Sequence, residues 1–144
     1  MRIDGAWRLC DDGVVRPLLR GHVRTANGQW RQAPFLVDTG ADRTVFSADL
    51  LEALGLLPAI GSQQLEGIGG QVASVVIATQ IRFTRETGAE ILFTGQFAAF
   101  IDLTSIDMSV LGRDLTNLFA VIVDRPQEVV CLLGGNHRYV VVEQ

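Results

Sequence analysis

The sequence predicts an all-β protein built as a single domain over residues 1–144. Short apolar runs of strand length recur along the chain, turn-forming residues separate them, and only two segments show helical spacing. The length of 144 residues suits one domain, and the 48% apolar content is enough for a core of ordinary size. No repeat, low-complexity stretch or linker divides the chain.

The clearest hairpin is expected near the N-terminus, where Val14–Thr25 and Trp30–Val37 flank Ala26-Asn27-Gly28-Gln29. Asn-Gly is the strongest short-range hairpin signal, because both residues tolerate positive φ. Further β structure is expected along the rest of the chain: a hairpin over Gln63–Ile77, strands over Val75–Phe83 and Ile91–Phe100, a hairpin of Phe119–Val123 with Val129–Leu133, and a terminal segment Tyr139–Val142.

Two short helices are expected between these strands. Ser47 can cap the first helix, three leucines follow at helical spacing, and Gly55 is a natural C-terminal stop. The second helix is expected over residues 113–118, where two leucines would share one face.

The charge pattern argues against a nucleic-acid partner. The 12 basic residues are all arginine and are scattered along the sequence, while 16 acidic residues give a net charge of -4. No segment reaches the ~20 apolar residues that span a bilayer, and no apolar run of signal-peptide length follows the N-terminus. We therefore expect no nucleic-acid partner, no membrane span in this sequence and a cytoplasmic location. The alternative of a membrane anchor outside this sequence stays open.

The cysteines and histidines indicate neither a metal site nor a cofactor. Cys10 and Cys131 lie far apart and match no zinc pattern, so two free thiols are expected more than one bridge. His22 and His137 have no partner at ligand spacing, which favours surface or structural roles.

One stretch of the sequence carries chemistry: Phe35-Leu36-Val37-Asp38-Thr39-Gly40-Ala41-Asp42. Three apolar residues of a buried strand deliver a carboxylate to a tight turn, where Gly40 allows close backbone approach. A plainer interpretation is a turn in which Asp38 only caps local amides, since Asp and Gly are ordinary turn residues. The motifs that follow favour the catalytic interpretation.

Three motifs in this order resemble the retropepsin-like aspartic proteases, a family of retroviral and related cellular and bacterial enzymes. Asp38-Thr39-Gly40-Ala41-Asp42 resembles their catalytic loop, and Gly67-Ile68-Gly69-Gly70 resembles the tip of the flap hairpin that closes over the substrate. Val110-Leu111-Gly112-Arg113-Asp114-Leu115 is similar to the loop and helix that support the catalytic turn. The resemblance implies a retropepsin-like acid protease half-barrel with a flap hairpin, one or two short helices and one lobe per chain.

The resemblance also implies roles for individual residues. Asp38 would be the catalytic residue, and Thr39, Gly40 and Arg113 would support the active-site loop. Thr39 would hydrogen-bond across a dimer axis, whereas Arg113 would form an ion pair with Asp42 rather than remain a solvated surface residue. The residues that would contact substrate are Gly40, Ala41, Asp42, Gly67, Ile68, Gly69 and Gly70.

A single catalytic carboxylate implies a homodimer. Aspartic proteases are the established case in which two carboxylates share one proton, so that one serves as base and the other as acid. The chain holds one Asp-Thr-Gly and no Asp-Ser-Gly, so the second Asp38 would come from a two-fold related copy. Tyr139–Val142 is a candidate for pairing between the copies, and a strand of the chain's own sheet is an equal alternative.

We therefore expect an aspartic endopeptidase that hydrolyses peptide bonds in extended polypeptides, with an acidic to mildly acidic optimum. The alternative is a catalytically silent dimerisation or peptide-binding module of the same fold. A third possibility is a subunit that dimerises weakly, so that concentration governs its activity. The intact Asp38-Thr39-Gly40 favours the enzyme, since a scaffold needs no carboxylate there.

Overall fold

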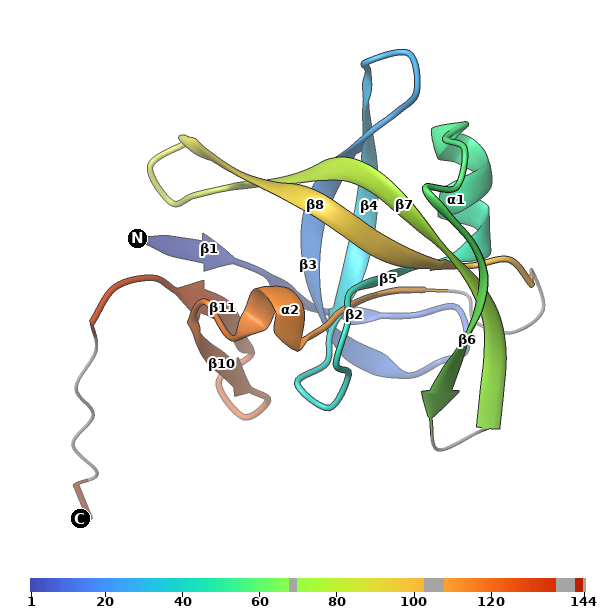
Figure 1. The fold of residues 1–144 in the computed structure, drawn as a ribbon. Helices are drawn as coiled ribbons and strands as arrows, with labels where there is room; N and C mark the ends of the chain where they lie inside the picture. The colour runs from blue at the N-terminus through green and yellow to red at the C-terminus, as the bar shows by residue number, and fades with distance from the viewer. Residues whose placement is uncertain (68–69, 103–107, 137–141, 144) are drawn as a thin grey trace.

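The computed structural model describes residues 1–67, 70–102, 108–136 and 142–143, and Figure 1 shows how the chain is folded. Within these residues the chain is mostly β with two short helices, which confirms the predicted fold class. The elements in order are β1 (Arg2–Asp4), β2 (Ala6–Leu9), β3 (Val15–Arg24), β4 (Trp30–Val37), β5 (Val45–Phe46), α1 (Ala48–Leu54), β6 (Ile60–Gly67), β7 (Gly70–Thr84), β8 (Glu90–Phe100), β9 (Ser109–Leu111), α2 (Arg113–Thr116), β10 (Ala120–Asp124) and β11 (Val129–Leu133).

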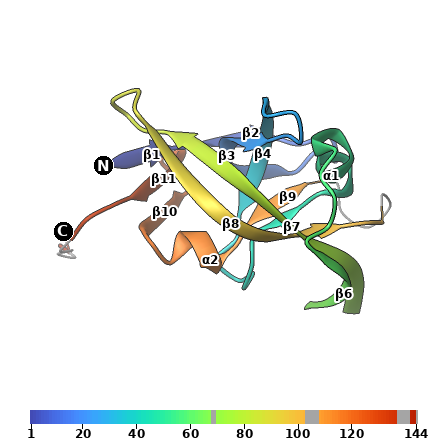
Figure 2. The ribbon, with the colours of Figure 1, turned by 45° about the horizontal axis from the view of Figure 1, so that its top comes forward.

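The strands form two sheets. The larger has eight strands in the order β2-β3-β4-β9-β5-β8-β7-β6, and the smaller has three in the order β1-β11-β10. Because β3 also pairs with β7, the larger sheet returns on itself and its middle strands form a closed ring. Figures 1 and 2 show the long strands β7 and β8 crossing β3 and β4 to enclose the core.

Two parallel pairings set the position of the Asp38 turn. β4 lies parallel to β9, with Leu36 opposite Val110 and Val37 opposite Leu111. β5 lies parallel to β8 and also contacts β9. The strand that leads into Asp38 is therefore joined directly to the strand that leads into α2, although the two are far apart in sequence.

Aromatic side chains fill the centre of the core. Phe35, on β4, is fully buried and packs edge-on against Phe46 and Phe83, with ring centroids 6.0 and 6.1 Å apart. Gly21, on β3, makes room for these rings, because a Cβ there would lie 2.8 Å from Phe83 and 3.1 Å from Phe35. Packing thus fixes the core-facing side of β4 near its end, shortly before Asp38.

Several predicted elements are confirmed in detail. β4 begins at Trp30 and ends at Val37, as expected from the sequence. Ser47 Oγ accepts a hydrogen bond from the Leu50 N–H at 3.2 Å, and Gly55 ends α1 in the left-handed region with φ of 65°. In the turn between β3 and β4, only Gly28 has positive φ. The prediction of this turn assumed that both Asn27 and Gly28 could adopt positive φ, and Asn27 does not do so.

Other elements differ from the prediction. The expected strand Val75–Phe83 is part of one 15-residue strand, β7, which continues without a break from the predicted flap hairpin. The stretch before Gly112, expected as a loop, forms strand β9, and α2 ends at Thr116 rather than at 118. Residues 139–141 of the expected terminal β segment lie outside the described residues, and Val142 is in no strand.

Cys10 and Cys131 are both free thiols, so the less expected bridge between them is not formed. Cys131 lies in the small sheet, where burial raises the pKa of its thiol. Among the described residues, no helix has the length and apolar character needed to cross a membrane.

Phe35→Ala should lower the free energy of unfolding by about 3–5 kcal/mol, since it opens a cavity at the centre of the aromatic cluster. Leu92→Ala, at a residue of β8 that is 52% exposed, should have a much smaller effect. Urea unfolding at one fixed chain concentration compares the two. Equal losses would contradict the placement of the core.

Candidate active site

The turn after β4 presents the Asp38 carboxylate. The Asp38 N–H donates to the Leu111 carbonyl at 3.2 Å, which extends the pairing of β4 and β9 by one residue. Asp38 Oδ1 accepts from the Gly40 N–H at 2.9 Å, and the Ala41 N–H donates to the Asp38 carbonyl at 3.2 Å. Asp38 Oδ2 makes no hydrogen bond within the described part of the chain. One oxygen is therefore held by the turn, and the other is available.

A partly buried hydrogen-bond network supports this turn from below. Thr44 is fully buried, and its N–H and Oγ1 both donate to Asp114 Oδ1, at 2.9 and 2.7 Å. Thr44 Oγ1 also accepts from the Gly112 N–H at 3.1 Å, and the Leu115 N–H donates to the same Asp114 oxygen at 3.0 Å. Hydrogen bonds to a charged acceptor are stronger than neutral ones, so Asp114 fixes the end of the turn to α2.

Arg113 contacts the turn at three points. Its N–H donates to the Ala41 carbonyl at 2.8 Å, its Nη1 donates to the Thr39 carbonyl at 3.3 Å, and its Nη2 contacts the Asp42 carboxylate. The Arg113 and Asp42 side chains are 45% and 81% exposed, so their ion pair alone adds little stability. The three contacts of Arg113 together hold the backbone of the turn in one shape.

Gly112 is required because two backbone segments cross there. A Cβ at this position would lie 2.2 Å from the Arg43 carbonyl carbon and 2.3 Å from its oxygen. No side chain fits, since real Cβ atoms essentially never approach a backbone atom within 3.0 Å. The close crossing brings the turn and the start of α2 into direct contact.

Comparison with known proteins identifies the family. The chain matches the aspartyl protease family over residues 22–137, a range that contains all three motifs. The chain belongs to this family.

The retropepsin-like fold is also shared with a solved structure of similar length. A retropepsin-like aspartic protease from Rickettsia conorii superposes with a TM-score of 0.57 at 19% identity, covering 92% of this chain and 90% of that one. The EIAV protease, solved in complex with the inhibitor HBY-793, gives a TM-score of 0.48 at 23% identity, covering 71% of this chain and 86% of that one. No protein in the curated set matches the chain.

The remaining predicted site residues of this aspartyl protease fall in two places. Thr39 lies exposed in the turn, and its predicted hydrogen bond across a dimer axis stays a prediction. Gly67 and Gly70 face each other at the end of the hairpin of β6 and β7. Ile68 and Gly69 lie outside the described residues.

Sequence reasoning did not assign roles to Thr44 and Asp114. Their signals were present but weak: Asp114 is an acidic residue in the first turn of a predicted helix, where the helix dipole favours it. Thr44 follows the Asp38 turn and directly precedes the apolar pair Val45-Phe46. Nothing in the sequence shows that Thr44 is fully buried.

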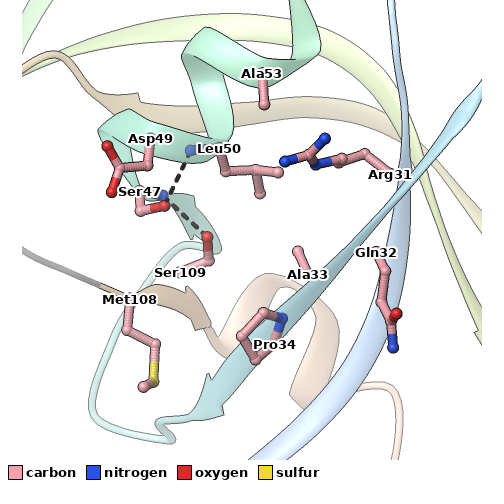
Figure 3. Close-up of a pocket in the computed structure, with 10 residues that line it drawn as sticks. All are labelled: Arg31, Gln32, Ala33, Pro34, Ser47, Asp49, Leu50, Ala53, Met108 and Ser109. Atoms are coloured by element: carbon pink, nitrogen blue, oxygen red, sulfur yellow. Dashed lines mark hydrogen bonds between the residues drawn. The ribbon is translucent and has the colours of Figure 1, made fainter. Parts of the chain in front are cut away.

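A cavity of about 170 Å³ lies further back along β4, between β4, α1 and the start of β9 (Figure 3). Arg31, Asp49 and Leu50 are among its lining residues, and the Ser47 N–H donates to Ser109 Oγ beside it at 3.0 Å. None of the predicted site residues lines this cavity. In the described ranges, no group of three or more His, Cys, Asp or Glu side chains could hold a metal ion.

Gly112→Ala should lower the free energy of unfolding by about 1–3 kcal/mol, because the added methyl group forces the two crossing backbones apart. Gly95→Ala is the matched control, since its Cβ would meet nothing closer than 3.7 Å. Urea unfolding measures both variants. A Gly112→Ala protein as stable as the control would show that the crossing is not tight.

Proposed function

We propose that this aspartyl protease is an endopeptidase whose active site pairs Asp38 of one chain with Asp38 of a second copy. The observation that carries the proposal is the state of the Asp38 carboxylate. One oxygen is fixed by the Gly40 N–H, the other is available, and the turn that holds them is anchored through Thr44 and Asp114. A carboxylate held in this way is preorganised to exchange protons with a reactant.

The proposed reaction needs only the two carboxylates and a water molecule. The ionised Asp38 takes a proton from water as the oxygen attacks the carbonyl carbon of the peptide, and the protonated Asp38 donates its proton to the carbonyl oxygen. The Asp38 that took the proton from water then gives it to the amine nitrogen as the C–N bond breaks, and the other Asp38 takes a proton from one hydroxyl of the tetrahedral intermediate, which leaves as the carboxyl product. The pair of carboxylates again holds one proton. Two carboxyl groups in contact cannot both ionise, because their negative charges repel each other. The proposed pair would therefore hold one proton over an acidic range.

The substrate class follows from the surfaces beside Asp38. In the proposed complex, a bound chain would lie between the Gly40–Asp42 turn and the hairpin of β6 and β7. The Ala41 N–H and carbonyl are already bonded within the protein, so the remaining main-chain groups of the turn and of the hairpin tip would contact it. An extended polypeptide satisfies such groups by adding a strand, and its alternate side chains then enter pockets that set preference. We therefore propose extended polypeptides as substrates.

Cleavage of a diverse peptide library between about pH 3 and pH 7, where paired carboxylates titrate, tests the proposal. Asp38→Asn should lower the cleavage rate by at least ~10²-fold, since it removes both the base and the acid. Asp11→Asn, in an exposed N-terminal turn, is the matched control and should cleave like the wild type.

The wild-type rate should also fall toward alkaline pH, where both members of the pair lose their proton. Undiminished cleavage by Asp38→Asn, or a flat profile up to alkaline pH, would contradict the proposal. Peptide binding without cleavage by either protein would instead support a catalytically silent module.

A further inference from the structure

The outer face of β3 and its neighbouring strands gathers arginines that are scattered in the sequence. On β3, Leu19 and Val23 are fully buried, so the alternate residues of this strand face away from the core. Residues directly opposite each other on paired strands share a face. The registers of β2, β3 and β7 therefore place five arginines on what we call the arginine face: Arg8, Arg16, Arg20, Arg24 and Arg82. The whole chain has a net charge of -4, so this face departs from the overall balance.

Three of these arginines already have partners within the chain. Arg16 and Arg82 form ion pairs with acidic side chains, at 2.6 and 3.2 Å, and Arg24 donates to a glutamine side chain at 3.2 Å. Within the described residues, the guanidinium groups of Arg8 and Arg20 have no hydrogen bond or ion pair. Two cationic groups of the arginine face are thus available to an anionic partner.

Arg8 and Arg20 both line a hollow of about 200 Å³. Leu18 and Pro34 line it as well, and they make part of its surface apolar. Asp4 is the acidic residue among the lining residues, and its charge is already paired with an arginine of β1 at 2.7 Å. The hollow therefore combines an apolar surface with two unpaired guanidinium groups, and its volume suits one or two side chains rather than a larger ligand.

The electrostatics of His22, which follows Arg20 on the same face of β3, agree with this picture. Burial lowers the pKa of His22, the charges of Arg82 and Arg20 lower it further, and Glu90 partly opposes them. Nearby positive charge has this effect because it disfavours the charged imidazole. The arginine face is therefore positive at His22 as well as at the hollow.

We infer that the arginine face binds an acidic segment of another polypeptide, whose glutamate or aspartate side chains are held by Arg8 and Arg20. Guanidinium groups match carboxylates in charge and in hydrogen-bond geometry. An apolar side chain next to the carboxylate would lie in the hollow against Leu18 and Pro34. None of these residues belongs to the predicted active site, so this surface is separate from the Asp38 turn and goes beyond the proposed function.

A polypeptide fits the arginine face better than a nucleic acid or an anionic membrane does. A nucleic acid presents a phosphate at every step, and membrane-binding surfaces use clusters of about four to eight basic residues, whereas two arginines of this face are unpaired. Asp12 and Glu90 also lie beside paired arginines of the face and would repel a continuous polyanion. The apolar part of the hollow suits a chain that mixes acidic and apolar side chains.

Fluorescence anisotropy at low salt, with a labelled peptide of alternating glutamate and leucine, tests the inference. The measurement uses the Asp38→Asn protein, in which the proposed chemistry cannot act on the peptide, so binding and cleavage are tested separately. Arg8→Gln and Arg20→Gln, each added to this protein, should raise the Kd at least ~5-fold, because each removes a charge-assisted hydrogen bond to a carboxylate. Arg20→Lys keeps the charge and should weaken binding less.

Arg31→Gln is the matched control and should leave the Kd unchanged. Arg31 is also an exposed arginine of β4, but it lies opposite the buried Val23 and lines the separate cavity beside α1 (Figure 3). Saturation with the peptide should also raise the pKa of His22, followed by NMR, because carboxylates brought to Arg20 favour the charged imidazole. A peptide with glutamine in place of glutamate should bind at least ~10-fold more weakly and leave that pKa unchanged.

A Kd that neither Arg8→Gln nor Arg20→Gln changes would overturn the inference, as would equal weakening by Arg31→Gln or equal binding of the glutamine peptide. Tighter binding of a single-stranded oligonucleotide, or of phosphatidylserine vesicles, that depends on the same two arginines would also overturn it and assign the face to another class of partner. Peptide binding that depends on both arginines supports the surface whether or not the wild-type protein cleaves peptides.

Discussion

The parallel pairing of β4 with β9 is the interaction on which the candidate site depends. It places the end of β4 beside the start of α2, so that the Asp38 N–H reaches the Leu111 carbonyl and the Gly112 backbone crosses Arg43. The aromatic core holds β4 from behind, and Thr44 and Asp114 hold the turn from below. Without this pairing, Asp38 would sit on an ordinary exposed turn, where a carboxylate is solvated and its direction is not fixed.

The same arrangement supplies one of the two carboxylates that the proposed reaction needs. The network fixes one carboxylate and offers a single acceptor oxygen, whereas peptide hydrolysis by this chemistry needs an acid and a base together. The exposed Thr39 and the exposed ion pair of Arg113 with Asp42 belong to the same turn as this carboxylate. In the proposed dimer, a second copy would lie against this turn and supply the second carboxylate.

The sequence predicted the parts of this fold that local chemistry determines. Trp30–Val37 was predicted from its apolar run and α1 from its cap and its terminal glycine, and both are present with the expected ends. β1, β5 and β9 are two or three residues long, too short to show a period, and exist because neighbouring strands pair with them. The role of Thr44 could not be predicted from the sequence either, because its burial and its hydrogen bonds depend on parallel pairing between distant segments.

The central claim is that one active site is built from two chains, and subunit mixing tests it most directly. Increasing amounts of Asp38→Asn are added to a fixed amount of wild-type protein, and peptide cleavage is measured after the subunits have exchanged. Random pairing of equal amounts leaves only about half of the wild-type chains paired with each other, so cleavage should fall by about half. Cleavage that stays constant as Asp38→Asn is added in excess would show that each chain works alone, and would contradict the account.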